Sequence, residues 1–182
     1  MNMEKLNYIL DRRSIRRFTD QKINEEQIKA LLTAAMFAPS AVNRQPWHFV
    51  VIDDPSMMEK IMEVHPHARM LQTASHAIVV CGDKLLQHDD GYWVVDCGAA
   101  AQNLLLAAFT MGLGSCWVGL HPREDRKNAF SRLLKLPSHV LPFALVALGY
   151  PAERKLRPDR FHTEKVKYNG WGQSYYEMKQ PG

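Results

Sequence analysis

Four arginines and a serine are concentrated near the start of this 182-residue chain, where residues 12–18 read Arg-Arg-Ser-Ile-Arg-Arg-Phe. Each guanidinium presents a planar fork of hydrogen-bond donors, which matches phosphate oxygens and the carbonyl edge of a flat ring. The four charges therefore indicate a binding segment for a small anionic ligand. Taken alone, such a segment is more often a solvated basic turn after a helix, so this interpretation needs support from the rest of the chain.

Uncharged hydrogen-bonding residues fill a second segment, between the prolines at positions 39 and 46. Ser40, Asn43 and Gln45 lie there, directly before an apolar strand-like run. An amide side chain offers a donor and an acceptor together, which suits a ligand edge with alternating C=O and N–H groups, such as a pyrimidine-like ring. Taken alone, this segment also has a simpler interpretation as an ordinary polar loop.

A third segment, residues 112–119, reads Gly-Leu-Gly-Ser-Cys-Trp-Val-Gly. Its glycines permit close backbone approach, and Trp117 supplies a flat aromatic surface, so the segment suits a planar cofactor. The alternative is a helix that ends at glycine and leads into a strand, with Trp117 in the core. The segment is not a dinucleotide-binding fingerprint, because that motif follows a strand and begins a helix.

A second basic cluster, near the end of the chain, consists of Arg154, Lys155, Arg157 and Arg160, and the formal net charge is +4. A nucleic-acid-binding protein usually has a concentrated basic stripe with interleaved aromatic residues. Two short clusters on either side of a neutral stretch suit a small anionic ligand better than a duplex. We therefore expect no nucleic-acid partner.

No set of residues predicts a metal site. The pair His65 and His67 lacks a third ligand, so we expect both histidines at the surface. Cys81, Cys97 and Cys116 are far apart and odd in number. Because each lies in an apolar context, we predict buried free thiols in a reducing compartment.

The chain carries no predicted targeting or membrane segment. Its first thirteen residues are polar and charged and lack the apolar core of a signal peptide. The most apolar long stretch, residues 99–120, is interrupted by amide residues and glycines. We therefore expect a cytoplasmic protein with no membrane contact.

Helices and strands alternate along the chain and must position these segments. The sequence predicts helices over 4–13, from the N-cap Asn24 to 36, and over 55–64, 92–111 and 124–134. It predicts strands over 47–52, 77–81, 115–120 and 143–148. We therefore predict one α+β domain over residues 1–182, with helices around a mostly buried sheet and a polar arm from about residue 150.

The predicted helix over 92–111 is apolar on most of its circumference, which indicates a buried central helix. Small residues at 98–101 would allow another helix to approach closely, and the long arm has little structure of its own. Both features predict an obligate homodimer that buries more than roughly 2,000 Å², as permanent interfaces do.

Taken in order, these segments resemble the nitroreductase family of FMN enzymes. The resemblance covers nearly the whole chain and rests on the segments at 12–16, 39–47, 96–108, 112–119 and 148–151 and on the basic tail. Each motif is weak alone, whereas the ordered set is highly specific. The resemblance implies a nitroreductase-like fold, with a mostly antiparallel central sheet flanked by helices, and an intertwined homodimer with two FMN sites across the interface.

The resemblance also implies which residues contact the flavin. From one subunit these would be Arg12, Arg13, Ser14 and Arg16. Lining the isoalloxazine ring, partly from the partner chain, would be Pro39, Ser40, Asn43 and Gln45. Under or beside the ring would lie Ser115, Cys116, Trp117 and Val118. The phosphate would be held by Arg157 and Arg160, with Lys155 as an alternative, and His67 and Arg69 are candidates for a further contact.

The implied activity is an FMN-dependent NAD(P)H oxidoreductase that uses NADH or NADPH in two half-reactions and passes hydride through flavin N5. Nitroaromatics, quinones and enones are the implied small-molecule acceptors. No classical catalytic residue is expected, and Arg16 near flavin N1 and O2 would stabilise the reduced ring. The alternatives are flavin fragmentation, reductive dehalogenation, a flavin-storage protein without turnover and, more distantly, a basic nucleic-acid-binding module.

Overall fold

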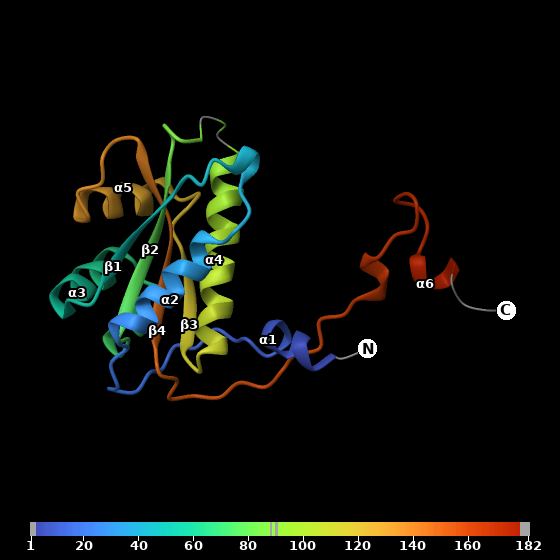
Figure 1. Cartoon of the computed structure of the whole chain (residues 1–182), viewed down its shortest axis with the longest axis horizontal. Helices are drawn as coiled ribbons and strands as arrows, with labels where there is room; N and C mark the ends of the chain where they lie inside the picture. The colour runs from blue at the N-terminus through green and yellow to red at the C-terminus, as the bar shows by residue number, and fades with distance from the viewer. Residues whose placement is uncertain (1–2, 88, 90, 179–182) are drawn as a thin grey trace.

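The fold, described over residues 3–87, 89 and 91–178 of a computed structural model, is built on one antiparallel sheet. Its four strands are β1 (Trp47–Ile52), β2 (His76–Asp83), β3 (Gly114–Gly119) and β4 (Val140–Gly149). They lie in the order β1-β2-β4-β3, and each neighbouring pair is antiparallel (Figure 1). β2 and β4 are therefore central, and nearly every residue in them is buried.

One face of the sheet is covered by α2 (Glu25–Met36) and α4 (Tyr92–Thr110), as Figure 1 shows. Leu31 of α2 and Leu104 of α4 share a buried cluster with Ile78 of β2. Because successive strand residues point to opposite faces, this face takes every second side chain of the central strands. Of the two helices on this face, α4 packs more extensively on the sheet.

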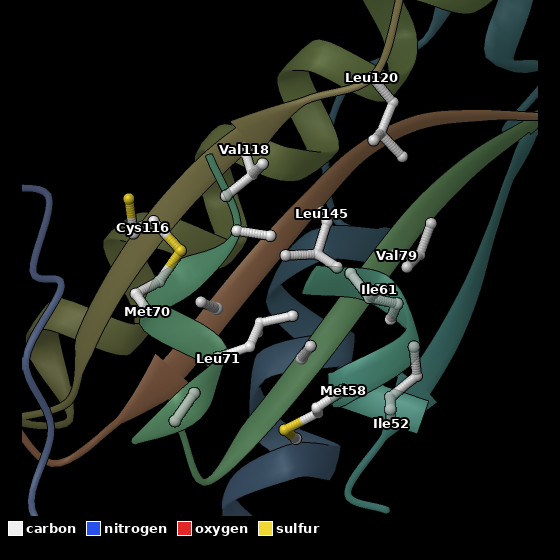
Figure 2. Packing of buried hydrophobic residues seen from close by; sticks show 14 of the residues in the cluster. Ile52, Met58, Ile61, Met70, Leu71, Val79, Cys116, Val118, Leu120 and Leu145 are labelled. Carbon is white, nitrogen blue, oxygen red and sulfur yellow. The ribbon is translucent and has the colours of Figure 1, made fainter. Parts of the chain in front are cut away.

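The other face is covered by α3 (Pro55–Val64) and α5 (Glu124–Leu133). Its buried cluster includes Ile61, Val79 and Leu145, and Figure 2 shows Ile61 lying over the two strand residues. With apolar clusters on both faces, the sheet has the layered arrangement of an α+β fold.

Local capping sets the starts of α2 and α3. The Asn24 side chain accepts a hydrogen bond from the Gln27 amide at 2.8 Å, and Gln27 Oε1 accepts one from the Asn24 amide at 3.1 Å. This is a capping box, which satisfies two amides that the first helical turn leaves free. At α3, Asp54 caps the amide of Ser56 and proline occupies the first helical position. The predicted starts of both helices are confirmed.

The first helix is shorter than the predicted range 4–13. After one 3-10 turn, Met3–Leu6, α1 covers only Asn7–Leu10. The chain then leaves the helix because the amide of Ile15 donates to Ser115 O of β3 at 2.9 Å. Pairing with the sheet edge thus replaces the helical hydrogen bonds that the apolar spacing predicted.

The two central strands are longer than predicted. The sequence predicts 77–81 and 143–148, whereas pairing extends over all of β2 and β4. The β4 extension contains Pro142, which lies opposite Cys81 where the register shifts. Such an irregularity accommodates proline in a central strand, because proline has no amide to donate to the ladder.

By length and composition α4 could cross a membrane, with a mean hydropathy of 1.2 in its most apolar window, and it is the one helix in the described ranges of which this is true. Its inner side packs on the sheet, as in the core helix of a globular protein. Its outer side is not covered, since Tyr92 and Val95 are 53% and 66% exposed. The predicted burial of this helix therefore holds for one side only within a single chain.

The chain after β4 forms the arm. It passes beside the segment at 12–18 and then extends away from the sheet in the same direction as α1 (Figure 1). Its helical turns are η4 (Thr163–Lys165) and α6 (Tyr175–Met178). Along this part of the arm large side chains are open to solvent, and Trp171 is 88% exposed.

Gly149→Ala is expected to destabilise the fold by about 1–3 kcal/mol, the usual cost of overpacking. A Cβ at this position would lie 2.8 Å from ring carbons of the buried Phe18, which would have to shift. Gly119→Ala, on β3, is the control, because a Cβ there meets nothing within 4 Å. Urea unfolding of both variants measures the difference, and equal midpoints would contradict the prediction.

Candidate functional site

The arginine segment, residues 12–18, lies along the outer edge of β3. Ser14 forms a parallel bridge with Ser115, and the Ile15 amide bonds the Ser115 carbonyl. Gly114, the next residue toward the start of β3, leaves the space that Ile15 occupies. The first and third segments singled out in the sequence thus lie side by side.

The basic tail lies along the other side of the arginine segment. The Arg16 amide donates to Glu153 Oε1 at 2.6 Å, and Lys155 Nζ donates to Ser14 O at 2.6 Å. The Arg16 amide is also the main reason that the pKa of Glu153 lies below its ordinary value. The arginine segment and the start of the basic tail therefore meet beside β3.

A hollow of about 540 Å³, called here the cationic hollow, opens where the arginine segment, the turn before β2, the end of β3 and α5 meet. Its lining residues are Arg16, His65, His67, Arg69, Met70, Cys116, Trp117, Val118, Gly119 and Arg126. Figure 2 shows the side chain of Met70 beside that of Cys116. Three lining residues carry guanidinium groups and none carries a carboxylate, so the hollow suits an electron-rich or anionic ligand.

Two further guanidiniums approach each other without a counter-ion. Burial is the main cause that lowers the pKa of Arg12, and the nearby charges of Arg13 and Arg160 lower it further. Within the described ranges, the side chains of Arg12 and Arg160 make no hydrogen bond or ion pair. An anion bound between these two groups would relieve their repulsion.

The other basic residues of the tail are already engaged. Arg157 donates through Nε to Asp11 Oδ1 at 2.6 Å and through Nη2 to Asn7 Oδ1 at 2.7 Å. Lys155 also pairs with Glu153 at 3.2 Å. Of the three phosphate candidates in the tail, Arg160 is therefore the one left without a partner in the described part of the chain.

Arg13 holds backbone rather than facing the cationic hollow. Its Nε donates to Leu156 O at 2.9 Å and its Nη1 to Arg12 O at 2.6 Å. Its Nη2 is buried and has no hydrogen-bond partner within residues 3–87, 89 and 91–178. The side chain thus joins the arginine segment to the arm.

Side chains of β3 alternate between the two faces of the sheet. Trp117 packs on the α4 face, where its ring centroid lies 5.4 Å from that of Phe143. Cys116 and Val118 belong to the cluster on the opposite face. Burial raises the pKa of the Cys116 thiol, while the charges of Arg16, Lys155 and Arg12 oppose that rise. Trp117 also lines the cationic hollow.

The thiol predictions agree with the structure. Cys81, Cys97 and Cys116 are free and buried. Burial raises the pKa of Cys81 to about 12, and it raises the pKa of Cys97 above its ordinary range. Within the described ranges, no group of three or more histidine, cysteine or acidic residues is arranged to hold a metal ion.

The polar loop at 39–45 does not reach the hollow within one chain. It packs near the start of α4, where the Ala41 amide donates to Asp96 Oδ1 at 2.9 Å. The arginine segment lies near the other end of α4, about 20 Å away by the rise of a helix (Figure 1). The structure therefore separates Pro39, Ser40, Asn43 and Gln45 from the arginine segment, and none of the four lines the cationic hollow.

This loop has an unusual backbone. Val42, Asn43 and Gln45 have φ angles of 54°, 54° and 49°, in the left-handed region that favours glycine. The conformation is held partly by Ser40 Oγ, which accepts a hydrogen bond from the Gln45 amide at 2.9 Å. The side chains of Val42, Asn43 and Gln45 are all exposed. Residues held in such conformations often lie at binding sites.

Comparison with known proteins identifies the family. The sequence profile of the Nitroreductase family matches residues 9–77 and 64–150, which include the arginine segment, the polar loop and β3 but not the basic tail. The chain belongs to the nitroreductase family. The predicted family and the predicted α+β fold with an antiparallel central sheet are thereby confirmed.

Individual nitroreductase relatives are similar over most of their length. A protein of Methanothermobacter thermautotrophicus, provisionally named NADH dehydrogenase/NAD(P)H nitroreductase, is 48% identical over 90% of this chain and 88% of its own length. A solved structure from Parabacteroides distasonis with the same provisional name has a TM-score of 0.88 at 38% identity, covering 92% and 99% of the two chains. A nitroreductase structure from Desulfovibrio desulfuricans, solved with FMN, has a TM-score of 0.79 at 31% identity, covering 91% and 96%.

Two residues that line the cationic hollow, His65 and Arg126, were not predicted as site residues. His65, expected at the surface, is fully buried, so that prediction was wrong. Its Nε2 lies 3.1 Å from Gly119 O, and Arg126 Nη1 donates to the same oxygen at 3.2 Å. No sequence pattern distinguishes Arg126 from the other charged residues of α5. By contrast, the candidates His67 and Arg69 both line the hollow.

Stability is expected to fall below about pH 6.5. Burial is the main cause that lowers the pKa of His65, His76 and His121 from the ordinary value of 6.5. Just below that pH the unfolded chain therefore binds more protons than the folded protein, which favours unfolding. Urea unfolding should show a free energy that is level above about pH 6.5 and declines below it. A free energy that rises on acidification would contradict this prediction.

Proposed function

We propose that this chain is an FMN-dependent NAD(P)H oxidoreductase that binds FMN along the arginine segment and in the cationic hollow. The observation that carries the proposal is the set of guanidiniums at Arg12, Arg16 and Arg160, which have no hydrogen bond or ion pair of their own in the described part of the chain. Family membership supports the enzyme class and the flavin.

The residues present fit FMN in charge and in size. A phosphate requires concentrated cationic donors, which Arg12 and Arg160 provide where their charges already repel. A flavin ring requires a flat wall and donors for its carbonyl edge, which the end of β3 and the guanidiniums of Arg16 and Arg69 provide. The volume of about 540 Å³ lies within the usual range of roughly 300–1,000 Å³ for ligand sites.

Each group has a distinct role in this proposal. Arg12 and Arg160 hold the phosphate, while Arg13 and Lys155 hold the backbone on either side of Ser14. Arg16 places a positive charge at the wall of the hollow, where it stabilises negative charge on a reduced ring. Bound FMN supplies the atom that accepts hydride from NADH or NADPH and passes it to an acceptor.

The polar loop completes the site from a second subunit. In one chain Ser40, Asn43 and Gln45 are remote from the hollow, while the outer side of α4 leaves Tyr92 and Val95 exposed. Packing two chains through this apolar side would cover it and bring the partner's loop toward the hollow. In this proposal the FMN site is therefore complete only in the homodimer.

We expect a dimer in dilute solution, because the side of α4 with Tyr92 and Val95 and the aromatic side chains of the arm are exposed to solvent in a single chain. Val95→Glu places a charge on this side and should weaken the dimer and FMN binding together. Exposed Val51 on β1, changed to Glu, is the control. Light scattering and FMN titration measure both effects. A stable monomer that retains flavin would contradict the dimeric site.

The proposed reaction has two half-reactions that share one space. NADH or NADPH reduces the flavin and leaves, and a nitroaromatic, quinone or enone acceptor then takes its place. The proposed location is the cytoplasm. The hollow is open to solvent on one side, which allows this exchange of flat substrates.

Anaerobic rapid mixing tests the proposal. FMN-loaded protein mixed with NADH or NADPH should lose its oxidised flavin absorbance quickly, and a nitroaromatic or quinone added next should restore it. A storage protein would show no rapid bleaching. Loss of absorbance restored by a haloaromatic but by neither of the other acceptors would favour reductive dehalogenation instead.

A further inference from the structure

The carbonyl oxygen of Gly119, at the end of β3, accepts hydrogen bonds from two side chains. His65 donates through Nε2 at 3.1 Å, and Arg126 donates through Nη1 at 3.2 Å. A carbonyl has two lone pairs, so both acceptor positions of this oxygen are filled. The Gly119 peptide is thus held from the α3 side and from α5 at once.

His65 also holds the facing wall of the cationic hollow. Its Nδ1 accepts a hydrogen bond from the His67 amide at 3.2 Å, so the ring is neutral and carries its proton on Nε2. The ring is fully buried and lies edge-on to Phe130, with centroids 6.2 Å apart. A single rigid ring therefore joins the turn that carries His67 and Arg69 to the end of β3.

Arg126 helps His65 to hold the Gly119 carbonyl, and it does so from the solvent side. It is half-buried on α5, and it lines the hollow together with Arg16 and Arg69. Its charge opposes protonation of His65, as burial does. Glycine at 119 leaves open space on its free side, so no side chain of its own fixes that peptide. The Leu120 amide holds the other side of this peptide by donating to Phe143 O at 3.2 Å, and the two side-chain donors hold its carbonyl oxygen.

We propose that His65 and Arg126 are positioning residues that fix the Gly119 peptide and the His67 turn, and thereby set the affinity and reduction potential of the flavin. This inference rests on the proposed function, because it assigns the walls of the same hollow. Neither residue needs to touch the flavin. Each acts by fixing backbone that lines the cationic hollow. A small displacement of that backbone alters a preorganised site.

Arg126→Met removes one donor while keeping an aliphatic side chain, and His65→Phe removes the other while filling the space. Each should raise the FMN dissociation constant about tenfold, the equivalent of one net hydrogen bond. Arg126→Lys and His65→Gln keep a donor near the same position and should recover part of the affinity. Arg132→Met is the matched control, because the exposed Arg132 of α5 donates, within the described residues, only to Asn128 O of its own helix.

Acidification supplies a second readout. Protonation of His65 places a proton on Nδ1 and ends its bond to the His67 amide, so FMN binding to the wild type should weaken on acidification. Because burial lowers the pKa of His65 from its ordinary value of 6.5, the weakening should set in below that pH. The other titratable or charged groups around the ring are Arg126, His67, Arg16, Arg69 and Cys116. His65→Gln should remove the acid weakening, whereas His67→Gln should retain it.

The measurements are FMN titration and the flavin midpoint potential of each holoprotein, with circular dichroism to verify folding. If folded Arg126→Met had a dissociation constant for FMN within twofold of wild type and an unchanged flavin midpoint potential, the inference would be overturned. An Arg126→Lys variant as impaired as Arg126→Met would also overturn it. Failure of the wild type itself to bind FMN would instead refute the proposed function, so the two failures are distinguishable.

Discussion

Replacing Arg16 with alanine is expected to lower the flavin midpoint potential and to slow flavin reduction by NADH by about tenfold to a hundredfold. The Arg16 guanidinium lines the cationic hollow and makes no side-chain hydrogen bond within the described ranges, so it is free to face a ligand. A hydrogen bond to a charged group contributes about 1.5–3 kcal/mol, which corresponds to this change in rate. Oxidised FMN should bind with a smaller loss, because its ring is neutral.

Arg17→Ala is the matched control for this prediction. Arg17 is the next residue, is exposed and does not line the hollow. Potentiometric titration and anaerobic rapid mixing measure the two variants in parallel. If Arg16→Ala abolished FMN binding and left the midpoint potential unchanged in any residual holoprotein, Arg16 would be a phosphate ligand and its assignment here would be wrong.

Arg160→Ala is expected to show the opposite pattern, with FMN binding weakened at least tenfold and nearly normal reduction once the site is saturated. Arg160 and Arg12 repel each other without an anion, and a phosphate between them would gain charge-assisted hydrogen bonds. Arg157→Ala is the control, because Asp11 and Asn7 already occupy that guanidinium. A larger loss of affinity in Arg157→Ala than in Arg160→Ala would contradict the assignment.

Much of the fold could be predicted where local signals set the element ends. β1 and α3 begin and end at the predicted residues, since the sequence Asp53-Asp54-Pro55 both ends the strand and caps the helix. The end of the first helix could not be predicted as well, because Ser14 and Ile15, just beyond it, pair with β3 about a hundred positions along the chain. Apolar spacing carries no information about that competing partner.

The candidate site was predictable as segments but not as individual side chains. Arg157 and Arg160 look equivalent in the sequence, and they differ because the partners of Arg157 lie 146 and 150 positions away. His65 likewise looked like a surface residue until the fold placed Gly119 O beside it. The position of the loop at 39–45 relative to the hollow depends on a second chain in our proposal, and no single-chain pattern specifies it.

The most direct test of FMN binding is a titration of the purified protein with FMN and, separately, with FAD, followed by flavin fluorescence. We expect one FMN per chain and tighter binding of FMN than of FAD, because the site proposed at Arg12 and Arg160 suits one phosphate. We also expect Arg12→Ala to weaken FMN binding at least tenfold. Absence of FMN binding, or clearly tighter binding of FAD, would contradict the central claim that this cationic surface holds FMN.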